Sequence, residues 1–112
     1  MHRHSREAET FIVLDGELDG WSNGEHSVVA GGSSLYLPPH IDHAFAVRSD
    51  TARFLVLLTP SGFEQLFMTD GQPVSTGADL PFPGPPPADE VPRLAELLST
   101  YGVELVGPPP AA

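Results

Sequence analysis

Two histidines and a carboxylate near the start of the chain have the spacing of metal ligands. His2 and His4 are separated by one residue, and four residues separate His4 from Glu9. Alternate side chains of an extended strand share a face, so the two imidazoles would point to one place. Two neutral imidazoles and a carboxylate suit a divalent first-row metal that keeps open coordination positions. We therefore predict a metal site here.

A second pair of histidines, His40 and His43, follows later in the sequence. His43 begins a strand expected over 43–47, in which Phe45 and Val47 share its face. An inward-facing histidine in an apolar strand needs partners for its ring nitrogens. His43 is therefore either a third ligand or a hydrogen-bonded core residue, and His40 is expected at a turn or a pocket rim.

Simpler interpretations compete with the ligand assignment. His2 and His4 could belong to a solvated terminus, and Glu9 could be a surface carboxylate, as we expect for Glu7. His26 is expected at the surface. The spacing to the other motif residues favours the ligand interpretation.

The elements that must position these residues are short strands. Alternation places Glu9, Phe11 and Val13 on one face, which we expect to be the inner one. Asn23-Gly24 and Gly31-Gly32 provide turns, and Pro38-Pro39 ends a strand. Regularly spaced strands with glycine-rich turns favour an antiparallel sandwich or barrel. The expected strands are 8–14, 17–21, 25–29, 34–37, 43–47 and 52–59.

The pattern changes after Pro60. Ser61, with Glu64 three residues later, is expected to cap a short helix that packs Phe63, Leu66 and Phe67 on the barrel. A proline- and glycine-rich stretch over 71–87 is expected to be a tether or wrapping arm. Asp89 is expected to cap a second helix that ends at Gly102, before a last apolar piece over 103–106. The apolar stripe of this helix is Leu94, Leu97, Leu98 and Tyr101.

These patterns divide the chain into three parts. Residues 1–71 are expected to form the barrel core with its short helix, and 72–88 a linker. Residues 89–112 are expected to form a C-terminal helix and tail that pack on the barrel or on a partner chain. A length of 112 residues fits one modest core.

Composition excludes several classes of protein. A formal net charge of −10 with only five Lys and Arg argues against binding to nucleic acid or to an anionic membrane. Cysteine is absent, so a metal must be held by histidine and carboxylate. The longest apolar run, Phe54 to Leu58, is too short to span a bilayer. No signal peptide is visible, and a cytoplasmic location is expected.

Two motifs resemble those of the cupin superfamily. The series His2, His4, Glu9 and Gly16 is similar to the first cupin motif, and Gly32, Pro38 and His43 are similar to the second. Fifteen residues separate Gly16 from Gly32, within the range of the family. The wider pattern, with EAETFIVLDGEL, PSGFEQLF and YGVELVGPPP, resembles small bacterial cupins described as quercetin-dioxygenase-like.

The resemblance implies an all-β double-stranded β-helix, or jelly-roll barrel, with one or two short C-terminal helices. It implies one divalent transition metal (Fe, Mn, Ni, Co or Zn) held by His2, His4, Glu9 and His43. The implied activity is that of a mononuclear metal-dependent dioxygenase for a small aromatic or flavonoid-like substrate, in which Glu9 can also take a substrate proton. The alternative is a non-catalytic cupin that binds a metal or a small molecule, or a truncated remnant with an incomplete site.

Several apolar residues could line a substrate pocket, although the same residues would also serve as barrel core. The pocket candidates are Phe11, Val13, Phe45 and Phe54, with His40 at the rim. Trp21 and Tyr36 are expected either in the pocket or in packing.

The chain departs from the family pattern in three places. The second motif usually has Gly where His40 stands, at a turn needing positive φ, and Asn where Val47 stands. Related cupins also carry several strands before the first motif. Either the natural chain begins upstream, or a partner completes the barrel, or a shortened form leaves a sheet edge exposed. Exposed edges and an extended tail favour a homodimer.

Overall fold

The computed structural model describes residues 1–75, 77 and 86–110, and an antiparallel two-sheet fold accounts for most of them. The six predicted strands are confirmed to within one or two residues at their ends. Two further strands of three residues each, β1 and β8, were expected only as an extended segment and an apolar piece, without the pairing that makes them strands. The strands are β1 His2–His4, β2 Ala8–Asp15, β3 Glu17–Ser22, β4 Glu25–Ala30, β5 Ser34–Leu37, β6 His43–Val47, β7 Arg53–Thr59 and β8 Val103–Leu105.

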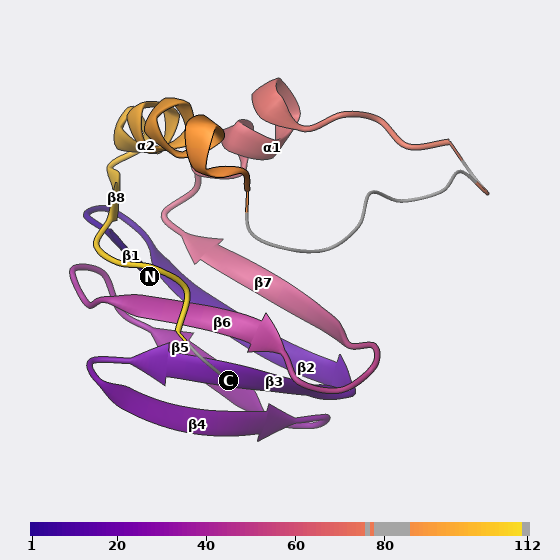
Figure 1. Ribbon diagram of the computed structural model, residues 1–112. Helices are drawn as coiled ribbons and strands as arrows, with labels where there is room; N and C mark the ends of the chain where they lie inside the picture. Colours follow the sequence, from indigo (N-terminus) through magenta and orange to yellow (C-terminus); the bar gives the residue numbers. More distant parts are fainter. Residues whose placement is uncertain (76, 78–85, 111–112) are drawn as a thin grey trace.

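The strands form two facing sheets, as a jelly-roll requires (Figure 1). One sheet has the order β4-β3-β6-β1-β8, and the other has the order β5-β2-β7. Asn23 and Gly24 both have positive φ at the β3–β4 hairpin, as a type I′ turn needs. His40 has a φ of +68°, so the positive φ expected at this turn is confirmed.

The barrel core forms where the inner faces of the two sheets meet. Phe11 and Val13 are each 1% exposed and pack with Leu18, Val29 and Leu37. This burial confirms the predicted inner face of β2.

Helical segments close one end of the barrel around a second apolar cluster (Figure 1). Phe63, Leu98 and Val103 are its buried members, and Leu66 and Leu94 pack against them. The segments are α1 Gln65–Asp70, a 3-10 turn η1 Ala88–Glu90 and α2 Val91–Ser99.

The structure corrects three details of this region. Ser61 does not cap α1: Glu64 stands at the N-cap position, and its carboxylate instead accepts the Gly62 N–H at 2.6 Å. Asp89 does not cap α2, because it lies inside the 3-10 turn that precedes the helix. Phe67 is 65% exposed rather than packed, since Phe63 already fills the contact with the second cluster.

The predicted tether over 71–87 is described only in part. Residues 71–75, 77 and 86–87 carry no helix or strand, and residues 76 and 78–85 of the tether lie outside the described residues. No helix within the described ranges is long and apolar enough to cross a membrane.

Candidate metal centre

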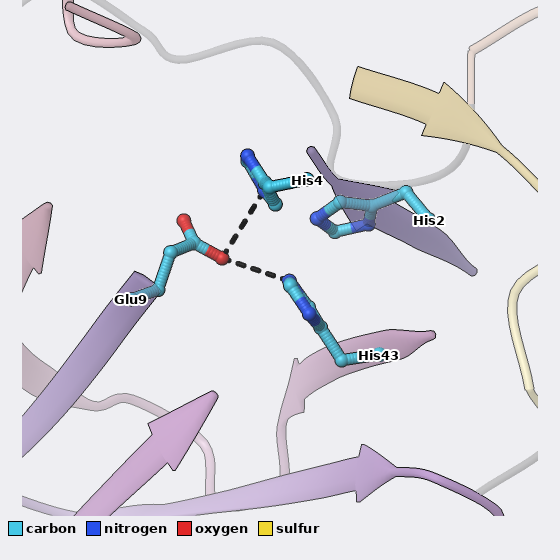
Figure 2. Close-up of side chains that lie close together, drawn as sticks. All are labelled: His2, His4, Glu9 and His43. Carbon is cyan, nitrogen blue, oxygen red and sulfur yellow. Dashed lines mark hydrogen bonds and ion pairs between the residues drawn. The ribbon is translucent and has the colours of Figure 1, made fainter. Parts of the chain in front are cut away.

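Three strands bring the four predicted ligand residues together. His2 and His4 come from β1, Glu9 from β2 and His43 from β6, and Figure 2 shows their side chains pointing toward one another. One ligand atom from each lies within 4.8 Å of the others. Donor atoms this close to one another are what a single small cation between them would need.

Glu9 contacts two of the three histidines of the cluster. Its Oε2 lies 2.8 Å from Nε2 of His43 and 3.4 Å from Nε2 of His4. The His4 and His43 rings are nearly parallel, with centroids 5.3 Å apart, and the His2 ring is edge-on to both. His4 and His43 are completely or almost completely buried, whereas His2 is half-buried.

The short strand β1 is held on both sides, which fixes His2 and His4. Within the five-stranded sheet, His2 pairs with His43 of β6, and all three β1 residues pair with β8. The backbone N–H of His40 donates to the His4 carbonyl at 2.7 Å, and the N–H of Val106 donates to the Met1 carbonyl at 3.0 Å. The unpredicted strand β8 is therefore part of the scaffold of the site.

The cluster perturbs the acidity of its members. Burial lowers the pKa of His2 to about 4, and the neighbouring His43 and His4 add to the effect. Burial opposes ionisation of Glu9, but contacts with the His4 and His43 rings outweigh it and hold the pKa of Glu9 at about 2. Burial also opposes protonation of His4, yet the Glu9 and Glu7 carboxylates raise the pKa of His4. At neutral pH the site therefore combines an ionised carboxylate with two imidazoles, His2 and His4, that differ in proton affinity.

The donor set fits a divalent transition metal. Nε2 of His4 is buried and lacks a hydrogen-bond partner among the described residues, although it faces the other three side chains. A buried polar atom left without a partner costs free energy, which a metal bond would recover. Imidazole nitrogen and carboxylate oxygen are ligands for zinc and for the redox-active metals of the first row.

The structure separates the pocket candidates into two groups. Phe11 and Val13 are core residues, with 1% exposure each. Phe45 lies on the inner face of β6, yet it is 41% exposed, and its ring contacts Phe11 at a centroid distance of 4.7 Å. Phe54 is half-buried and packs against the same rings.

The remaining candidates lie apart from the cluster. His40 lines a polar hollow of about 290 Å³ with Arg3, Asn23 and Asp42. Tyr36 is 61% exposed, so it serves neither pocket nor core. His26 is an exposed residue, as predicted; it hydrogen-bonds Asp19 at 2.7 Å, and its ring lies near Trp21.

One residue at the site was missed. Glu7, expected at the surface, is 1% exposed, and its Oε2 lies 3.4 Å from Nδ1 of His4. No spacing rule indicated this, because Glu7 lies in the turn between β1 and β2 and is buried by tertiary contacts. The sequence shows an acid two residues before Glu9, but it does not show that this acid is buried.

Comparison with known proteins gives two matches. A family model described as a cupin domain matches residues 1–59, more than half of the chain. Quercetin 2,3-dioxygenase of Bacillus subtilis (strain 168) is 26% identical over 107 residues, which are 96% of this chain and 31% of that protein. The chain thus spans about a third of the length of this relative. The matched residues 1–59 include the strands that carry all four clustered side chains. The chain belongs to the cupin family.

Proposed function

We propose that this cupin binds one divalent transition metal through His2, His4, Glu9 and His43. The observation that carries the proposal is the convergence of four ligand atoms within 4.8 Å, with Nε2 of His4 buried and without a hydrogen-bond partner among the described residues. Reconstitution with Zn²⁺, Mn²⁺, Fe²⁺, Co²⁺ or Ni²⁺ should load close to one ion per chain. Less than about a tenth of an ion per chain would contradict the proposal, because an assembled site of this kind loads nearly fully.

We further propose a quercetinase-like dioxygenase activity on a small aromatic or flavonoid-like substrate. The likeness to a quercetin 2,3-dioxygenase and the apolar inner face beside His43 support it. A bound redox-active metal would supply a centre for an oxygenated substrate and O2. Phe45, two residues from His43 on the same face, would contact an aromatic ring, and the ionised Glu9 would accept a proton from a substrate hydroxyl.

One observation favours a non-catalytic metal- or small-molecule-binding cupin. Three residues on the inner faces of the sheets, Phe45, Val47 and Val56, are 41%, 48% and 44% exposed. Water therefore has access to the interior, whereas active sites for oxygen chemistry gain from its exclusion. This alternative has the same metal site as the proposed dioxygenase, but it does not turn over a substrate.

Oxygen consumption separates the two candidates. Metal-loaded protein is mixed aerobically with a panel of flavonols, and O2 uptake is measured with wild type, His43→Ala and His26→Ala. An enzyme consumes O2, loses the activity in His43→Ala and keeps it in His26→Ala, because His26 lies outside the cluster. Full metal loading without O2 uptake on any flavonol would establish the binder.

A further inference from the structure

Glu7 is a buried carboxylate with a single side-chain partner. It is 1% exposed, and its only hydrogen bond or ion pair within the described residues is with Nδ1 of His4 at 3.4 Å. Asp19, another buried acid, is compensated by Arg48 and His26. A buried carboxylate is costly unless it is paired, so the position of Glu7 calls for an explanation beyond packing.

The His4 ring lies between two carboxylates. Glu7 is next to Nδ1, and Glu9 is 3.4 Å from Nε2, which has no hydrogen-bond partner among the described residues. A neutral imidazole carries one N–H donor and one lone pair, and the partner of the donor decides which nitrogen holds the proton. When Nδ1–H donates to Glu7, the Nε2 lone pair faces His2, Glu9 and His43.

We propose that Glu7 is a positioning residue that holds His4 in the Nδ1–H tautomer and thereby prepares Nε2 as a metal ligand. This inference rests on the proposed metal site. Ligating histidines commonly donate their other ring N–H to a carboxylate, which fixes the ring and raises its basicity as a ligand. The Phe63 ring, perpendicular to His4 at a centroid distance of 4.9 Å, restricts the imidazole from the side.

The second ring nitrogen is held differently in the two buried histidines. In His4 it lies beside the Glu7 carboxylate. Nδ1 of His43 is buried and has no hydrogen-bond partner in the described part of the chain. His43 is instead oriented through Glu9, at 2.8 Å from its Nε2. The two buried imidazoles are therefore held differently: His43 by a candidate ligand, and His4 by a carboxylate outside the ligand set.

The test uses two substitutions of Glu7 and one matched control. Glu7→Leu removes the acceptor and keeps the volume, and an apolar replacement of a buried charge is often tolerated in folding. Glu7→Gln keeps an oxygen that can accept from Nδ1–H. Glu104→Gln removes an exposed carboxylate of β8 that faces β1 and contacts Arg3.

Affinity for Zn²⁺ is measured by competition with a chromophoric chelator. Glu7→Leu should weaken binding about 10- to 100-fold, the usual effect of losing such a carboxylate partner. Glu7→Gln should restore most of the affinity, and Glu104→Gln should match wild type. Wild-type affinity in Glu7→Leu would overturn the inference.

The His4 tautomer is read independently of any metal, from ¹⁵N shifts of the ring nitrogens in metal-free protein at a pH where His4 is neutral. Wild type should show the proton on Nδ1, and Glu7→Leu should move it to Nε2, next to Glu9. A wild-type Nε2–H tautomer would overturn the inference whether or not the variants fold. Failure of wild type to bind Zn²⁺, with the Nδ1–H tautomer observed, would instead refute the proposed metal site alone.

Discussion

Phe11 and Phe45 are the same residue type in contact with each other, yet the structure predicts different consequences of removing them. Phe11 is 1% exposed and lies in the barrel core, so Phe11→Ala should leave a cavity and cost about 3 to 5 kcal/mol. Phe45 is 41% exposed, so only about three-fifths of a full burial term is lost, about 1 to 2 kcal/mol. A domain of this size is stable by only about 5 to 15 kcal/mol in total.

Urea unfolding followed by circular dichroism measures the difference. With a slope of about 1 to 3 kcal/mol/M, Phe11→Ala should lower the midpoint by more than about 1 M, and Phe45→Ala by clearly less. Phe67→Ala is the matched control, because Phe67 is 65% exposed and loses only about a third of a burial term, about 0.5 to 1 kcal/mol, so it should move the midpoint least of the three. Flavonol binding to metal-loaded protein should weaken in Phe45→Ala, which removes a ring from the exposed inner face.

The result that would refute this reasoning is an equal loss of stability in Phe11→Ala and Phe45→Ala. Phe45 would then be covered in solution, and the inner face of β6 would not be open to a substrate. A second copy of the chain would be one such cover, which sedimentation would detect.

Three further predictions concern a turn, an ion pair and the metal. Gly16→Ala should cost about 2 kcal/mol or more, because its Cβ would lie 2.4 Å from the Thr51 carbonyl oxygen at a φ of +81°. Gly24→Ala, where a Cβ would meet open space, should cost less, and thermal melting compares the two variants. Hydrogen bonds from His26 and Arg48 lower the pKa of Asp19 below its usual 3.8, so their stabilisation is present above that pH and is lost as pH falls through the lowered pKa. The Tm difference between wild type and Asp19→Asn should therefore be large at pH 6 and shrink at pH 3; a constant difference would contradict the assignment. Zn²⁺ at a hundredfold excess over its Kd should stabilise wild type and His26→Ala by about 2.7 kcal/mol, visible as a rise in Tm. His43→Ala should show a much smaller rise, and the effect in wild type should fade as protons displace metal from the imidazoles at lower pH.

Local signals sufficed for most of the barrel. Alternation in β2 and the Asn23-Gly24 turn are properties of neighbouring residues, so the strands they define were predicted. Strands β1 and β8 have three residues each and exist because they pair with each other across almost the whole chain. Such pairing is tertiary, and no short window of sequence contains it. The predicted helix caps were wrong for a related reason. Contacts around Phe63 and the 3-10 turn decide where α1 and α2 begin.

The candidate site was predictable where residue type and spacing suffice. The first motif predicts His2, His4 and Glu9, and the second predicts His43. The structure brings all four side chains together. The sequence did not reveal how exposed the pocket candidates are. Phe11 and Phe45 have equivalent patterns in their strands, but only the packing of the two sheets makes one core and leaves the other open.

The scaffold of the site joins both ends of the described chain. Val103 of β8 pairs with His4 of β1 and is 2% exposed in the cluster that includes Phe63, whose ring contacts His4. The ligand strand and the helical end of the barrel are therefore one packed unit. Because β1 is short, its order depends on β6 and β8 rather than on its own propensity. A metal bound to His2, Glu9 and His43 would connect β1 to β2 and β6 and so bridge the two sheets, stabilising a strand of only three residues.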